Sequence, residues 1–259
     1  MNYIIATVVV FNKSINDSAA IQCLSKIKNI DLLVIDNSET DYHNQELCEK
    51  LNIHYLSNGG NIGLSKAYNI ITNKLLNSPY KYILLCDDDT EISQAYIDEI
   101  NTLIKEDYDI IIPRIIDGDS GNVYSPKVYN NTPFLTKVYN DQPYKYIKAI
   151  NSGLCIKLSI FNEFKYNENN FLYFVDVDLF ENYVNKKPAT TKVTNTSLVQ
   201  NLSHLTESLS DGQITQMQLR LKDSKAFNNW LTHNTYKLAF VMQMYLRYKD
   251  KRLLSLLRI

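Results

Sequence analysis

Long apolar runs, paired cysteines and a strong excess of one charge are all missing from this chain of 259 residues. No uninterrupted apolar stretch approaches the roughly 20 residues of a membrane-spanning helix, so we expect no segment to cross a bilayer. The net charge of -1 argues against binding of nucleic acid by the chain as a whole. The four cysteines form no CxxC pair, and Cys86 and Cys155 lie in apolar segments. This usage predicts reduced core thiols and a cytoplasmic location.

A basic leader and a small-residue cleavage site are also missing from the N-terminal segment MNYIIATVVVFNKS. We therefore expect a β-strand there rather than a signal peptide. Internal repeats and low-complexity linkers are absent too. The composition, 45% hydrophobic and 21% charged, is globular, and the length fits one large domain or one domain with an appendage.

Charge is distributed unevenly along the chain. From Ile214 onward there are nine basic and two acidic residues, a net charge of +7. The remaining 18 basic and 26 acidic residues give residues 1–213 a net charge of -8. We therefore predict a main domain over residues 1–213 and a distinct basic helical tail over residues 214–259.

The first half of the sequence alternates between two patterns. Strand patterns lie at residues 3–11, 31–38, 53–58, 81–89 and 108–113, and helix patterns lie at residues 16–29, 45–52, 63–77 and 93–106. This alternation indicates βαβ units, and so an α/β fold with a parallel sheet. The second half is less regular, with loops and a β-hairpin expected over 114–148, a strand and short helix over 149–164, a helix within 170–187 and a strand over 190–204.

Polar residues follow four of the predicted strands, as Phe11-Asn12, Asp36-Asn37, Asn58-Gly59-Gly60-Asn61 and Asp87-Asp88-Asp89. Ligands of open parallel sheets bind outside the carboxyl ends of the strands. If these ends converge, Asp36 and Asp87 would bind a base and ribose, and Asp89 would bind a magnesium or manganese ion that bridges to phosphates. The alternative is that residues 89–91 cap the next helix and interact with its dipole.

A second acidic stretch, NFLYFVDVDLFENY, places Asp176 and Asp178 in an apolar, aromatic setting. Desolvation there would raise the pKa of Asp176, as a general base requires. The alternative is that Asp176 is the N-cap of a helix over residues 177–185. We rank Asp178 as supporting. His204 would be a further metal ligand or, alternatively, a structural or solvated histidine.

Together these motifs resemble the GT-A-fold glycosyltransferases of family 2, and within them the bacterial rhamnosyltransferase-like branch. The matching segments are VVVFNK, LVIDNSET, NIGLSKAYN, CDDDT, INSGLCI, FLYFVDVDL and LSH, in the family's order across roughly residues 3–208. The resemblance implies a mostly parallel sheet flanked by helices, with a nucleotide-binding half over residues 1–113, an acceptor half over residues 114–213 and a C-terminal helical tail.

The resemblance also implies a role for each matching residue. Asp176 would be the catalytic base of an inverting transfer, and Asp89 and His204 would bind Mn²⁺ or Mg²⁺. The nucleotide-binding residues would be Phe11, Asn12, Asp36, Asn61, Lys66, Asp87 and Asp88. The acceptor side would consist of Asn151, Ser152, Gly153 and Asp178. The chain departs from the family where an arginine often stands six residues after the base, because Asn182 occupies that position. The diphosphate contact that this arginine would make is then either missing or made by Lys66, Arg114 or Lys186-Lys187.

The implied donor is a nucleotide sugar, dTDP-rhamnose as first choice and a UDP-hexose next, and the implied acceptor is a glycan or a lipid-linked glycan in cell-surface polysaccharide synthesis. One alternative is a catalytically impaired protein that only binds sugar nucleotides, which Asn182 leaves open. A haloacid-dehalogenase-like phosphatase is the other, suggested by ILLCDDDT. It fits less well, since three strand patterns precede the motif and Glu91 stands where Thr or Val is expected.

Apolar residues recur at helical spacing in the tail among basic ones, as Leu238, Val241, Met242, Tyr245 and Leu246. Such a helix fits the surface of an anionic membrane, which would make the protein peripheral on the inner face of the cell membrane. The alternative is that it packs on the main domain or on a second subunit, giving a homodimer.

Overall fold

The computed structural model describes residues 2–130, 136–140, 145–187, 189–200, 209–226 and 230–259. Its centre is an eight-stranded sheet with strand order β11-β5-β10-β4-β1-β2-β3, and β6 pairs with β5 at its side. The strands are β1 (Ile4–Val10), β2 (Asp31–Asp36), β3 (His54–Ser57), β4 (Tyr82–Cys86), β5 (Ile110–Asp117), β6 (Val123–Ser125), β10 (Leu154–Lys157) and β11 (Thr191–Gln200). Strands β4, β1, β2 and β3 run parallel, as do β5 and β11, whereas β10 is antiparallel to both neighbours. The predicted α/β fold with a mostly parallel sheet is confirmed.

Helices cover both faces of this sheet, which explains why its strands are apolar without interruption. In β1, Ile4 and Ala6 join one buried cluster while Ile5, between them, joins the other. The first cluster includes residues of α1 (Ala19–Leu24) and α4 (Gln94–Leu103), and the second includes residues of α3 (Leu64–Leu75). Helix α2 (Asn44–Leu51) precedes the edge strand β3. Short 3-10 helices at Ile15–Asp17, Ile104–Glu106 and Leu158–Asn162 complete the connections.

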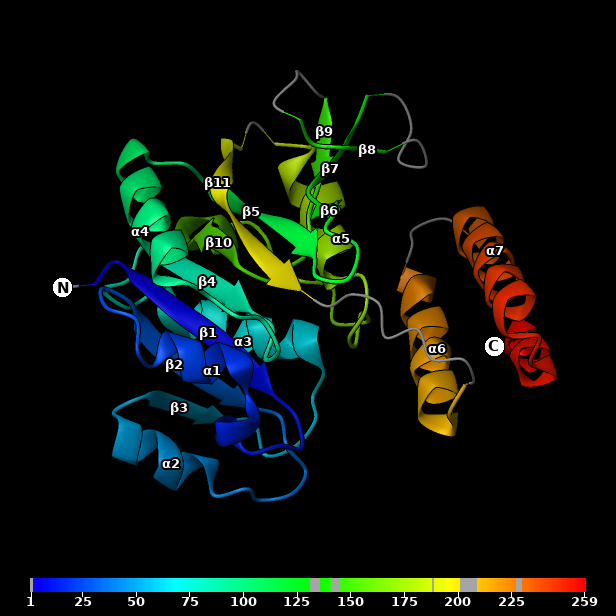
Figure 1. Cartoon of the computed structure of the whole chain (residues 1–259), viewed down its shortest axis with the longest axis horizontal. Coiled ribbons are helices and arrows are strands. Elements are labelled where there is room, and N and C mark those ends of the chain that lie inside the picture. The colour runs from blue at the N-terminus through cyan, green and yellow to red at the C-terminus, as the bar shows by residue number, and fades with distance from the viewer. Residues whose placement is uncertain (1, 131–135, 141–144, 188, 201–208, 227–229) are drawn as a thin grey trace.

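The predicted hairpin region forms a second, three-stranded antiparallel sheet of order β8-β7-β9, with β7 (Lys127–Tyr129), β8 (Lys137–Val138) and β9 (Tyr146–Lys148). It stands beyond β5 and β6, next to α5 (Val175–Leu179), as Figure 1 shows. A π-helical turn over Phe180–Val184 continues α5.

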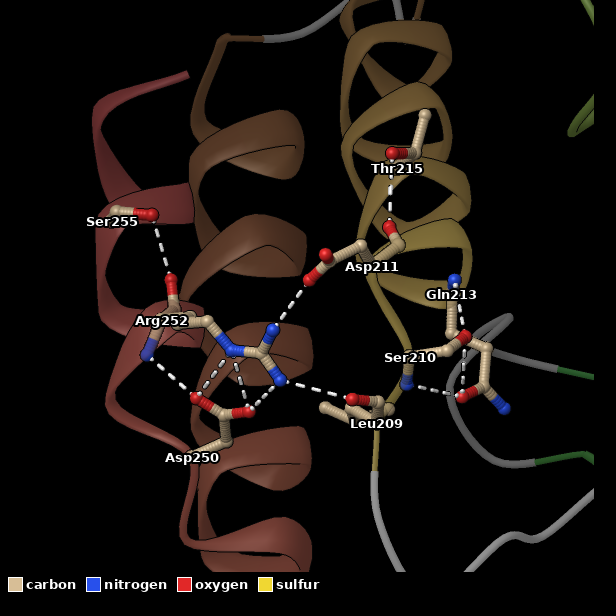
Figure 2. Close-up of polar contacts among 8 residues, drawn as sticks. All are labelled: Leu209, Ser210, Asp211, Gln213, Thr215, Asp250, Arg252 and Ser255. Atoms are coloured by element: carbon tan, nitrogen blue, oxygen red, sulfur yellow. Dashed lines mark hydrogen bonds and ion pairs between the residues drawn. The ribbon is translucent and has the colours of Figure 1, made fainter.

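The tail consists of α6 (Asp211–Asp223), a 3-10 turn (Ser224–Ala226), α7 (Trp230–Tyr248) and a 3-10 helix (Lys251–Arg258). It lies beside the main sheet and has a small core of its own, which includes Leu221, Val241, Leu253 and Leu256. A capping box between Ser210 and Gln213 begins α6. The Arg252 guanidinium connects the start of α6 to the last 3-10 helix. It donates to Asp211, to Asp250 and to the Leu209 carbonyl (Figure 2). Among the helices described here, α7 included, none has the length and apolar character needed to span a bilayer.

Candidate active site

The carboxyl ends of β4, β1, β2 and β3 meet at one edge of the sheet, as expected from their parallel register. Asn12 and the segment after β2 are joined there, because the Asn12 backbone N–H donates to Ser38 Oγ at 2.9 Å. Asn58 Nδ2 donates to Asn37 Oδ1 at 2.7 Å. Phe11 is exposed beside them. The predicted convergence of the strand ends is therefore present in the structure.

Asp36 is 6% exposed, and its carboxylate is a hub of hydrogen bonds. Oδ1 accepts the Ser38 N–H at 2.8 Å, and Oδ2 accepts from Asn44 at 2.8 Å and from the Tyr55 hydroxyl at 3.0 Å. Burial, followed by the charge of Asp36, raises the pKa of Tyr55 to about 12. Asp36 thus connects the end of β2 to α2 through Asn44 and to β3 through Tyr55. The sequence revealed neither of these partners.

The start of α3 is docked onto the loop that leads to Asp176. The Leu64 N–H donates to the Phe171 carbonyl at 2.6 Å. Gly63 has φ +85°, and a Cβ there would lie 2.8 Å from Phe171 Cδ2, so glycine is needed for this approach. Asn61 Oδ1 accepts the Gly63 N–H at 3.3 Å, while Lys66 is exposed. Phe171 opens the matching segment FLYFVDVDL, but the sequence predicted no role for it.

The acidic triplet follows β4, and its three carboxylates have different surroundings. Asp88 Oδ2 forms an ion pair with Lys13 Nζ at 2.6 Å, whereas Asp89 is exposed. Burial raises the pKa of Asp87 to about 7, and the charges of Asp89, Asp176 and Asp88 add to the effect. Asp87 therefore lies within electrostatic range of both Asp89 and the predicted base Asp176, although Asp176 is 89 residues away from Asp87 in the sequence.

The alternative that residues 89–91 cap the next helix is wrong. Helix α4 begins after Ser93, whose side chain accepts the Tyr96 N–H, and its first turn contains no acidic residue. Ser93 already caps α4 by accepting the Tyr96 N–H. Helix capping therefore does not explain the acidic residues at 87–89.

Beneath the triplet lies a buried polar cluster of Thr90, Ser152 and Gln200. The Thr90 and Ser152 hydroxyls are hydrogen-bonded to each other, and Gln200 Nε2 donates to Thr90 Oγ1 at 2.6 Å. Ser152 Oγ also accepts the Asp87 N–H at 3.4 Å. Ser152, predicted on the acceptor side, thus supports the acidic strand end, together with two residues that the sequence did not single out.

Asn151 and Gly153 flank Ser152 and are buried. The Gly153 N–H donates to the Leu85 carbonyl at 2.7 Å, and its φ is +78°. A Cβ at this position would overlap with Leu198 Cδ1. Gly153 therefore allows β10, β4 and β11 to pack closely.

Gly153→Ala is expected to destabilise the fold by about 1–3 kcal/mol beyond the strain of its backbone, because the added methyl overpacks against Leu198. Chemical denaturation would measure the loss. Gly121→Ala is the matched control, since its φ is +69° and an added methyl group there would have no neighbour within 4 Å. Equal losses in the two variants would contradict the packing argument.

Asp176 lies within the first turn of α5, and the prediction that it caps a helix over 177–185 is wrong. The cap is Phe174, which has a left-handed φ of 64°, so the helix begins at Val175. Asp176 Oδ1 accepts the Val177 N–H at 2.8 Å. Burial raises the pKa of Asp176, while that N–H and the charges of Arg220 and Lys148 lower it. The direction expected for a general base is confirmed.

Asp178 is buried and binds two groups of its own chain. Its Oδ2 accepts the Asn167 N–H, and its Oδ1 accepts from Asn182 Nδ2, both at 2.6 Å. Lys186 Nζ donates to Asn182 Oδ1 at 3.0 Å. Asn182 thus serves this local network, and Arg220, from the tail, is a cation acting on Asp176 that the sequence analysis did not consider.

A pocket of about 140 Å³ opens beside Asp176. Tyr124 and Phe180 form parts of its wall, and Lys127 and Lys148 supply positive charge. Lys148 Nζ is 3.3 Å from Glu181 Oε1. The pocket therefore places Asp176 and two lysines around one open space.

The carboxylates of Asp87 and Asp89 fit a divalent ion that is completed by phosphate oxygens. In the described part of the chain, no group of three His, Cys, Asp or Glu residues forms a site by itself. Magnesium ions are often held by one or two carboxylates together with substrate phosphates, and a cation would relieve the mutual repulsion that acts on Asp87. His204 lies outside the described residues.

Residues 8–169 match the family model for glycosyl transferase family 2. The chain belongs to this family. It is 29% identical over 167 residues to the low-salt glycan biosynthesis hexosyltransferase Agl10 of Haloferax volcanii, covering 60% of this chain and 53% of that protein. It is 24% identical over 185 residues to the dTDP-rhamnosyl transferase RfbF of Shigella flexneri, covering 70% and 60%. The chain thus spans little more than half the length of these relatives.

Solved structures agree on the fold of this family 2 chain. S. aureus TarS 1–349 superimposes with a TM-score of 0.56 at 13% identity, over 99% of this chain and 83% of that one. The same TarS segment in complex with UDP gives a TM-score of 0.55 at 14% identity, over 95% and 72%. The predicted family and GT-A fold are confirmed. The phosphatase alternative is wrong, because the acidic motif follows β4 rather than the first strand of the fold.

Proposed function

We propose that this chain is an inverting, metal-dependent glycosyltransferase that moves a sugar from a nucleotide-sugar donor to an acceptor hydroxyl. The proposal is carried by Asp87 at the end of β4, which lies within electrostatic range of both Asp89 and Asp176, together with the open pocket beside Asp176. The similarity to a hexosyltransferase and to a dTDP-rhamnosyl transferase supports it, as does the UDP complex of TarS.

In the proposed reaction, the acceptor enters the pocket and its hydroxyl donates a hydrogen bond to the Asp176 carboxylate. Asp176 takes the proton as the hydroxyl oxygen attacks the anomeric carbon, and the bond to the nucleoside diphosphate breaks on the opposite face, which inverts the configuration. Asp87 would bind the donor ribose and Asp89 would hold the ion. When bound, Mn²⁺ or Mg²⁺ supplies Lewis-acid stabilisation of the diphosphate charge.

The first choice of donor is dTDP-rhamnose and the second is a UDP-hexose, with a glycan or lipid-linked glycan as acceptor. The test is the melting temperature with dTDP, UDP and GDP, each with and without Mn²⁺. Ligand at 100 times its Kd stabilises by about 2.7 kcal/mol, which raises the melting temperature of a chain of this size by about 5–10 °C. A rise that needs one nucleotide and the metal would support the proposal and identify the donor class. No rise with any of them would overturn it.

The transfer rate is expected to rise with pH along a limb above the ordinary pKa range of an aspartate. Burial raises the pKa of Asp176, and the base acts only when it is deprotonated. Since the charge of Arg220 lowers that pKa, Arg220→Gln should move the limb of kcat/KM to higher pH. Lys222→Gln, which removes an exposed charge from the same helix, is the control and should leave the limb in place. A limb that moves to lower pH in Arg220→Gln would contradict this assignment.

We also propose that the tail rests on an anionic membrane surface. Leu238, Met242 and Leu246 lie four residues apart on α7 and are 54%, 40% and 59% exposed, which forms one apolar stripe. The net charge of +7 from Ile214 onward complements anionic lipid. The test is co-flotation of the protein with lipid vesicles, prepared either with or without anionic lipid. Leu246→Glu should bind the anionic vesicles more weakly than wild type. A dimer that Leu246→Glu dissociates, without vesicle binding, would instead identify the stripe as a subunit contact.

A further inference from the structure

The loop over residues 167–174 connects three parts of the molecule just before Asp176. Asp178 holds its beginning through the Asn167 N–H, and α3 holds its middle through the Phe171 carbonyl. Its end is held by the tail, through residues of α6 and α7. The position of Asp176 therefore depends on a segment that the predicted domain boundary separates from the main domain.

Asp223, the last residue of α6, is hydrogen-bonded to the loop. Its carboxylate is buried, with 2% of the residue exposed. One oxygen, Oδ2, accepts the Leu172 N–H at 2.8 Å and the Tyr173 N–H at 2.7 Å. Burying a carboxylate is unfavourable unless hydrogen bonds compensate it. The two amides are therefore held where this oxygen lies.

Arg220, one turn earlier on α6, holds the same loop through aromatic rings. Its guanidinium carbon lies 5.4 Å from the ring centre of Tyr173 and 5.5 Å from that of Phe174. Its Nε donates to the Tyr236 hydroxyl of α7 at 2.7 Å. The Phe174 and Tyr236 rings meet edge to face at 5.4 Å. Phe174 is the left-handed residue from which α5 begins, so these contacts fix the start of the helix that carries Asp176.

We propose that Asp223 and Arg220 are positioning residues for the transfer reaction, and that helix α6 thereby completes the active site. This inference rests on the proposed function. Asp223 fixes the backbone of residues 172–173, Arg220 fixes Phe174, and together they set where the Asp176 carboxylate meets the acceptor. A misplacement of about 1 Å at a reacting group can reduce a rate by about 100-fold.

The experiment compares Asp223→Ala with Asp223→Asn in the full chain. Alanine removes the acceptor for both amides, and we expect kcat to fall by about 10- to 100-fold, with the KM for donor within about twofold of wild type, because the donor-binding strand ends lie elsewhere. Asparagine keeps an oxygen at the same place and should restore most of the rate. Hydrogen exchange of residues 167–176 should quicken in the alanine variant and not in the asparagine variant.

Arg252→Ala is the matched control. Arg252 joins parts of the tail to one another, as Figure 2 shows. Its described contacts do not include the loop, so this variant should lower stability and leave kcat unchanged. If Asp223→Ala does not fold, Arg220→Gln removes the aromatic contact instead, at a residue that is only partly buried. It should lower kcat on the high-pH plateau, where Asp176 is deprotonated in both proteins and a change in its pKa no longer affects the rate.

A folded Asp223→Ala variant with faster exchange and wild-type kcat would overturn the positioning role. An equal loss of kcat in Arg252→Ala would also overturn it, since general loosening of the tail would then be sufficient. A wild-type chain that binds no nucleotide and transfers no sugar overturns the proposed function, and the positioning role falls with it.

Discussion

Asp176→Asn is expected to reduce kcat by about 10²–10⁴-fold, the usual contribution of a general base, while nucleotide binding stays intact. The amide keeps the size of the side chain but cannot take the proton of the acceptor hydroxyl. Rates with saturating donor and acceptor, together with the nucleotide-dependent rise in melting temperature, would measure the two effects separately.

Asp176→Glu is the matched variant, because it restores a carboxylate at a displaced position and should recover part of the rate. Transfer at the wild-type rate in Asp176→Asn would place the base elsewhere. If wild type itself binds nucleotide with metal and transfers no sugar to any acceptor, the chain is the impaired sugar-nucleotide binder that Asn182 leaves open.

Asp89→Asn is expected to abolish the metal-dependent part of the nucleotide stabilisation, a loss of about 5–10 °C at 100 times Kd. Asp89 is the exposed carboxylate of the triplet, and its charge raises the pKa of Asp87. Both observations fit an oxygen ligand directed at an ion between protein and diphosphate.

The neighbouring Asp88→Asn is the control for this prediction. The Asp88 carboxylate is already paired with Lys13 Nζ at 2.6 Å, so its loss should leave the metal-dependent rise largely in place. If Asp88→Asn abolishes the rise and Asp89→Asn does not, the assignment of the ion to Asp89 is wrong.

The sequence alone determined the fold class, the family and the edge of the sheet at which the site lies. Each of these follows from a pattern that extends over several neighbouring residues. Strands covered on both faces are apolar throughout, helices repeat every three to four residues, and parallel strands end at a common edge. Asp36, Asp87 and Asp89 could be placed on this basis.

The sequence could not predict the first residue of each helix, because neighbouring residues were equally suitable as N-caps. Asp89 and Ser93 are both good N-cap residues, and only the path of the backbone selects Ser93. Likewise α5 begins one residue before Asp176, because Phe174 takes a left-handed conformation that its side chain does not favour. Tertiary packing around Phe174 decides this.

Only the tertiary structure decided which residues contact the proposed site carboxylates and the segments that carry them. Gln200 donates to Thr90 across 110 residues of sequence, and Asp223 holds the Leu172 amide across 51. A single polar contact of this kind involves one residue on each segment and does not constrain the residues next to them. It therefore leaves no periodic pattern in the sequence. The proposed base, Asp176, was therefore visible in the sequence, whereas the contacts of helix α6 with the loop before it became visible only in the folded chain.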